Sequence, residues 1–171
     1  MPKTSVKIED RDRGYKKLAA TLGELGTVTL GVQGKEALEK HPESELTVGE
    51  IAAIHELGLG VPKRSWLVSW MDANQARMLR ETNLALSQVL KGVISRNKAL
   101  AALGFEWTKD IREVVSSGGV EPALAHPRPD GTTAPLYDTH TLHNSITYKI
   151  WLPQARSIRD PAQRAVVNKV K

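Results

Sequence analysis

Cysteine is absent from the 171-residue chain, which excludes disulfides, zinc–thiolate sites, iron–sulfur clusters and thiol nucleophiles. Long apolar runs are also absent, since no stretch approaches the roughly 18 apolar residues of a membrane span. Glu9, Asp10 and Asp12 stand where a signal peptide needs an apolar run. We therefore expect a chain that is synthesised in the cytoplasm and has no membrane partner.

Positive charge exceeds negative charge only slightly, with 24 Lys and Arg against 19 Asp and Glu. Most of these charges alternate in sign along the chain, whereas a nucleic-acid-binding face usually shows clustered Lys and Arg. The exception is the basic C-terminal extension, residues 153–171, which carries Arg156, Arg159, Arg164, Lys169 and Lys171 against a single Asp160. A basic nucleic-acid-binding module is therefore an alternative function, although such a segment is more often simply solvated.

Periodicity and capping signals divide the rest of the chain into helices and strands. Thr47 and Glu50 have the spacing of a capping box, and Gly58 ends the helix that they open. We expect helices over residues 9–25, 48–57, 65–90 and 98–116, strands over 27–32 and 144–152, a polar loop over 33–46 and a Pro-rich loop over 120–135. These elements predict a single α+β domain over residues 1–152, in which a small antiparallel β-sheet has helices packed on one face, including one long central helix.

The sequence contains no complete catalytic motif. His55 and Glu56 begin an H-E-x-x-H pattern, but Leu59 stands where the second histidine is needed. We expect these two residues to lie near a helix end, where an imidazole satisfies terminal carbonyl groups. His140 and His143, with Asp138 as a third ligand, leave a metal hydrolase as a further alternative, weighed against a loop-anchoring role. We predict no enzyme, no cofactor and no metal site.

Two features have a local structural interpretation and an open functional one. Asp138 and Thr139 form a pair that accepts backbone N–H groups at a turn and fixes the entry to the next element. Trp66 and Trp70 lie one turn apart at the start of the long helix. Large aromatic side chains in so aromatic-poor a chain favour the core, but tryptophan is also enriched in interface hot spots. Both locations stay open for these two residues.

Two separated segments carry recognisable motifs. The first motif segment is residues 46–67, LTVGEIAAIHELGLGVPKRSWL, and the second motif segment is residues 135–148, PLYDTHTLHNSITY. The first is similar to the signatures A-x-I-H-E-F-G and I-P-x-R-S-F, and the second is similar to P-L-x-D-T-G-x-L-x-x-S-I-T-Y. Together they resemble the tail-completion or virion-morphogenesis family of Mu-like and lambda-like tailed phages, the minor tail and neck proteins. The motif residues are Thr47, Glu50, His55, Glu56, Gly58, Asp138, Thr139 and Ser145. His140 stands where the family has glycine, so the turn has either lost a positive-φ position or tolerates histidine there.

The resemblance implies a non-catalytic structural subunit of the virion, assembled in the host cytoplasm. Such a tail terminator, tail-completion or neck protein forms a homo-oligomeric ring of about six copies at the head–tail junction or at the head-proximal end of the tail. Its implied partners are tail-tube and head-completion proteins, with genomic DNA close by. We expect the contact with neighbouring subunits or the tail at Pro62, Arg64, Ser65, Trp66 and Trp70, since this extended, glycine-flanked segment brings an arginine and an aromatic residue to a helix start.

Overall fold

The computed structural model describes residues 26–42, 44–126, 128, 131, 134–136 and 140–152. Its elements in chain order are β1 (Thr27–Val32), α2 (Lys35–Leu38), α3 (Val48–Leu57), α4 (Val68–Leu90), α5 (Arg96–Ser116), α6 (Thr141–Ser145) and β2 (Ile146–Trp151). The expected helix over residues 9–25 and the basic C-terminal extension lie outside the described residues. The α+β class is confirmed.

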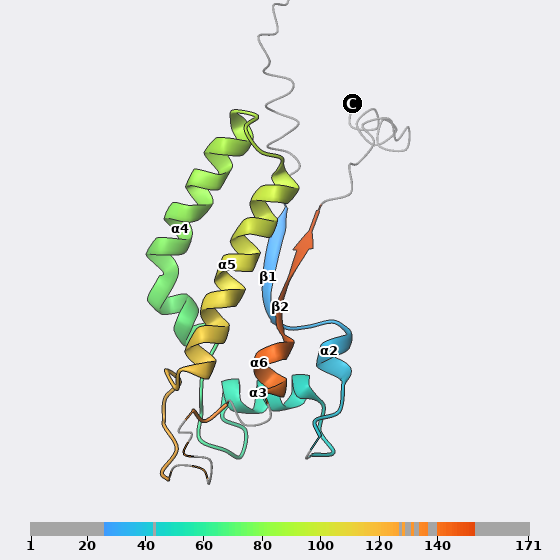
Figure 1. The fold of residues 1–171 in the computed structure, drawn as a ribbon, viewed down its shortest axis with the longest axis vertical. Helices are drawn as coiled ribbons and strands as arrows, with labels where there is room; N and C mark the ends of the chain where they lie inside the picture. Colours follow the sequence, from blue (N-terminus) through green and yellow to red (C-terminus); the bar gives the residue numbers. More distant parts are fainter. Residues whose placement is uncertain are drawn as a thin grey trace, which may run out of the picture. The chain divides into compact units, whose positions relative to one another are not determined.

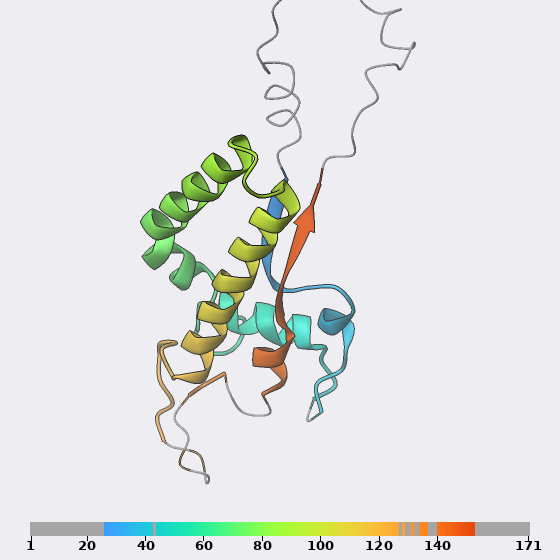
Figure 2. The same cartoon turned by 45° about the horizontal axis from the view of Figure 1, so that its top comes forward.

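The sheet in the described part of the chain consists of β1 and β2, paired antiparallel with Thr27 opposite Trp151 and Val32 opposite Ile146. Helix α5 lies along this sheet, as the two views in Figures 1 and 2 show. The closest approach is at Gly104, because a Cβ atom placed there would overlap the ring of Tyr148. The strands thus put Leu30, Tyr148 and Ile146 toward α5, as their alternation predicts.

The core gathers where α3, α5, α6 and the sheet meet. Ile111, Val115, Val48 and Ile146 are completely buried there. Tryptophan supplies most of the remaining volume, from Trp66, Trp70 and Trp107. The single Phe is not part of this core. Three of the four tryptophans therefore lie in the core, whereas Trp151 at the end of β2 is exposed.

Helices α4 and α5 run antiparallel and are joined by the short turn at residues 91–95 (Figure 1). The guanidinium of Arg77 on α4 pairs with the Asp110 carboxylate on α5. On the same side, Nε1 of Trp107 donates to Glu81 at 2.7 Å. These contacts fix one face of α4 against α5 and leave the opposite face without a partner among the described elements.

Four expected elements differ in their bounds from those observed. Helix α5 begins at Arg96 and not at residue 98, because Ser95 caps it through the Lys98 amide. The predicted polar loop 33–46 contains the one-turn helix α2 and a bridge between Lys40 and Thr47. Helix α4 begins at Val68 and not at residue 65, because residues 65–67 connect α3 to α4. The carboxylate that caps the start of α4 comes from α3. Strand β2 begins at Ile146 since α6 occupies the residues before it. None of the helices in the described part is sufficiently long and apolar to cross a bilayer.

Candidate assembly site

Helix α3 begins at the capping box that the sequence predicts. The Glu50 amide donates to Thr47 Oγ1 at 3.3 Å, while the Thr47 amide donates to the Glu50 carboxylate at 2.7 Å. These hydrogen bonds from the Thr47 backbone and hydroxyl hold the pKa of Glu50 below its ordinary value. The first motif segment therefore starts with a closed, pre-ordered helix end.

The C-terminal end of α3 is set by Gly58, whose φ of 73° places it in the left-handed region. Its N–H donates to the carbonyl of Ile54 at 2.8 Å. A Cβ atom at this position would also lie 2.8 Å from Cβ of Lys63, so glycine is required for space as well as for φ. The chain reverses here, and the Arg64 amide returns to the His55 carbonyl at 2.8 Å.

Glu56 has a role that the sequence analysis did not predict, because it caps the next helix. Its carboxylate accepts hydrogen bonds from Ser65 Oγ at 2.6 Å and from the amides of Leu67 and Val68 at 3.0 and 3.1 Å. Helix α4 has no side-chain cap of its own, so this carboxylate satisfies its first amides and faces the positive end of its dipole. A capping box is recognised in a sequence from two residues that lie three positions apart. Glu56 lies nine residues before Ser65, so this sequence pattern does not predict its capping role.

His55 does not satisfy terminal carbonyls through its imidazole, so that expectation is wrong. Its Nδ1 atom is buried without a hydrogen-bond partner. It is the backbone carbonyl of His55 that closes the turn, by accepting from Arg64. Burial, followed by the nearby positive charge of Arg64, lowers the pKa of His55 below its ordinary value. Both effects favour the neutral form of the His55 imidazole.

The two tryptophans of the expected contact surface are buried within the chain. Trp66 is 3% exposed and Trp70 is 5% exposed, so both belong to the core, and nearly all of their area is already covered within one chain. Nε1 of Trp66 donates to the carbonyl of Ala52 at 3.4 Å, and the Arg77 guanidinium lies 5.7 Å from the Trp70 ring centre. The core location, one of the two left open above, is the one observed.

The other three residues of the expected contact have different surroundings. Pro62 is exposed. The Ser65 hydroxyl is engaged by Glu56, and Arg64 Nε donates to the carbonyl of Pro122 at 3.0 Å. Arg64 therefore ties the turn after α3 to the loop after α5. A contact of Pro62, Arg64 and Ser65 with a neighbouring subunit stays a prediction.

The second motif segment packs against the first through α6. Leu142 and Ser145 are buried, and the Ser145 hydroxyl donates to the Thr141 carbonyl at 2.8 Å. His140 has a positive φ of 58°, so histidine tolerates a left-handed backbone at this turn. Asp138 and Thr139 lie outside the described residues, and their predicted turn role stays a prediction.

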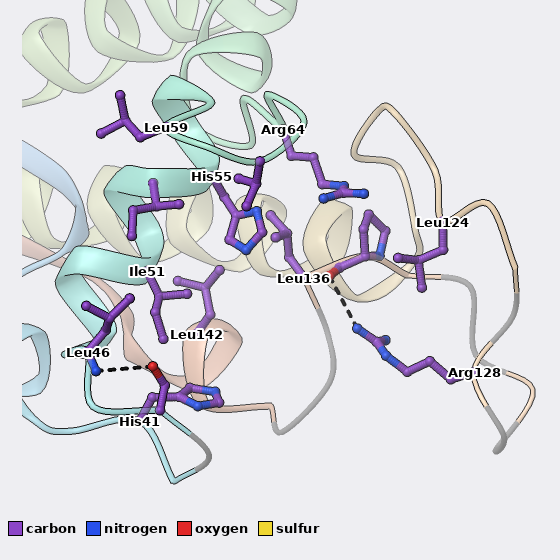
Figure 3. A pocket seen from close by; sticks show the side chains of 14 residues that line it. His41, Leu46, Ile51, His55, Leu59, Arg64, Leu124, Arg128, Leu136 and Leu142 are labelled. Carbon is purple, nitrogen blue, oxygen red and sulfur yellow. Dashed lines mark hydrogen bonds between the residues drawn. The ribbon is translucent and has the colours of Figure 1, made fainter.

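A pocket of about 570 Å³ lies between the two motif segments (Figure 3). The first segment contributes Ile51, Ile54 and His55, and the second contributes Leu136 and Leu142. Its walls are mainly apolar. The segments that carry the resemblance, although separated by about 70 residues of chain, thus form one structural unit.

The metal-hydrolase alternative has no support in the described residues. Among them, no three His, Asp or Glu side chains are grouped as metal ligands. His143 Nδ1 lies 3.0 Å from the Asn144 side-chain oxygen. The third candidate ligand, Asp138, lies outside the described part of the chain.

Large apolar side chains are exposed on the outer face of α4 and beyond its end. Leu79 and Leu90 on this face and Val93 just beyond the helix are exposed, whereas Leu86 on the same face is half-buried. Phe105 on α5 is 59% exposed and Trp151 at the end of β2 is 60% exposed. Scattered apolar residues are normal on protein surfaces, but several large ones on one helix face, together with two exposed aromatics, are typical of an association surface.

Comparison of the chain with protein-family models, with curated proteins and with solved structures finds no match.

Proposed function

We propose that this chain is a structural subunit of a tailed-phage virion, which forms a ring at the head–tail junction or at the head-proximal end of the tail. The observation that carries the assembly role is the apolar surface left exposed by α4, Phe105 and Trp151. A subunit that functions by association requires such surface, and obligate interfaces are the apolar ones.

The virion assignment depends on the two motif segments. Their packing around a common pocket supports a shared structural origin, because both parts of the resemblance then belong to one unit. Thr47, Glu50, Glu56 and Gly58 each have a structural role in the first segment, in two helix caps and one turn. Motif residues that build a scaffold are consistent with a function carried by surfaces and not by catalysis.

The experiment is to delete the coding region of this chain from the phage that encodes it and to image the resulting particles by electron microscopy. We expect unjoined heads and tails, or tails of irregular length, and restoration of infectious particles by the wild-type chain supplied in trans. Normal, infectious particles made without the chain would contradict the proposal.

The net positive charge favours one second candidate, a nucleic-acid-binding module. A gel-shift titration of the purified chain against duplex DNA at two salt concentrations distinguishes the two functions. Tight binding that weakens steeply with salt favours the nucleic-acid module. Weak binding at low salt alone is what a ring around passing DNA would show.

A further inference from the structure

The β1–β2 sheet presents two unpaired edges. Within residues 26–152 as described, β1 pairs with β2 alone and no third strand joins either of them. A two-stranded sheet is only marginally stable by itself, and a row of unpaired backbone groups is a template for another strand. These edges are therefore candidate surfaces for association.

The side-chain hydrogen bonds show which backbone groups face outward. Gln33 Nε2 donates to the carbonyls of both Thr29 and Thr147, on the two different strands, so these carbonyls lie between the strands. Because backbone direction alternates along a strand, the groups of Tyr148 and Ile150 face away from β1. Arg112 agrees with this assignment, since it reaches around to donate to the Ile146 carbonyl at 2.6 Å.

One exposed aromatic side chain, Phe105 on α5, lies beside this outer edge of β2. Phe105 lies seven residues before Arg112, on the same side of α5, and so stands over the edge about 10 Å farther along β2. Trp151 belongs to the face away from α5, and its Nε1 donates to Thr29 Oγ1 at 3.2 Å, so its ring lies toward β1 and not toward this edge. An added strand would cover Phe105, which is 59% exposed in the single chain.

The chemistry of the edge selects the incoming strand. It must place apolar side chains toward α5, and it must bring no positive charge beside Lys149. Strand β1 of a second copy has this pattern, because Val28 and Leu30 alternate with Thr27 and Thr29 and the strand has no charged residue. Pairing of β2 with β2 would instead bring two copies of Lys149 close together.

We propose that the outer edge of β2 pairs with the outer edge of β1 from a second copy of this chain. Different surfaces then meet at each junction, and a repeated head-to-tail contact of this kind closes into a ring when its rotation allows. The inference rests on the proposed ring, since it names the surface through which copies meet. Each junction extends the sheet by two strands and removes one unpaired edge from each copy.

The test is hydrogen exchange of the full chain, followed by mass spectrometry over a range of protein concentrations. We expect exchange in the peptides covering residues 27–32 and 146–151 to slow by about tenfold or more as the chain associates. The variant Phe105→Glu should weaken association by about tenfold or more, because it places a charge over the edge. Leu38→Glu, at another exposed apolar position, on α2, is the matched control and should associate like wild type.

Three results would overturn the strand pairing. The first is association that leaves both strand peptides unprotected, and the second is protection of residues 146–151 without residues 27–32. The third is the absence of any concentration-dependent protection in the wild-type chain. The first two results leave the proposed virion ring intact with a different contact surface. The deletion experiment on particles tests the virion role independently of this pairing.

Discussion

Replacing Gly104 with alanine tests the packing of α5 on the sheet. In an exposed helix this change stabilises by about 1 kcal/mol, because alanine has the higher helix propensity. At Gly104 the new Cβ would overlap the Tyr148 ring, which lies in a strand and has little room to move. Overpacking of this kind costs about 1–3 kcal/mol. With the cost near the upper end, we expect a net loss of about 1–2 kcal/mol.

The assay for Gly104→Ala is thermal denaturation followed by circular dichroism. For a chain of this size the loss corresponds to a fall in Tm of about 3–6 °C. Thr82→Ala on exposed α4 is the control, and it should raise Tm slightly through helix propensity alone. In the background Tyr148→Leu, which removes the obstructing ring, Gly104→Ala should become stabilising. A rise in Tm for Gly104→Ala in the wild-type background would refute this account of the packing.

Three further changes test the caps and turns of the motif segments. Glu56→Ala should lower the free energy of unfolding by about 2–3 kcal/mol in urea denaturation, because three donors lose a charged acceptor. The control Glu106→Ala, at an exposed position of α5, should lower it by less than about 0.5 kcal/mol. Equal losses for the two variants would contradict the capping role of Glu56. The pKa of His55 is lower in the folded chain than in the unfolded chain, so the unfolded chain binds the proton first and stability falls as the pH drops through the ordinary histidine range. Arg64→Gln should raise the pKa of His55 measured by NMR titration, because it removes the nearby positive charge. A lower pKa in this variant would contradict the effect assigned to Arg64. His140→Gly should raise stability by about 0.5–1 kcal/mol and His140→Val should lower it, with an unchanged Tm for both as the contrary result.

Local signals predicted the elements whose causes lie within a few residues. The capping box at Thr47 and Glu50 and the glycine at position 58 fix both ends of α3, and the observed helix has the expected bounds. Strand β1 also has its expected bounds, because alternation over six residues is sufficient to define it. The start of α4 was misplaced since its cap comes from Glu56 on another helix.

The burial of particular side chains depended on contacts that no local pattern contains. Trp66 and Trp70 fit equally well in a core or at an interface when only their spacing is known. Their burial follows from how α3 and α5 meet α4. The location of Phe105 beside the strand edge was likewise not predictable from a local pattern. Phe105 and Arg112 are seven residues apart on one helix, and only the folded chain shows that both lie over the same edge of β2.

Quantitative mass spectrometry of purified infectious particles tests the central claim most directly. The account predicts that this chain is present in every preparation at a fixed ratio to the tail proteins, and that the ratio is unchanged by further purification on a density gradient. Loss of the chain from particles that keep full infectivity would contradict the account.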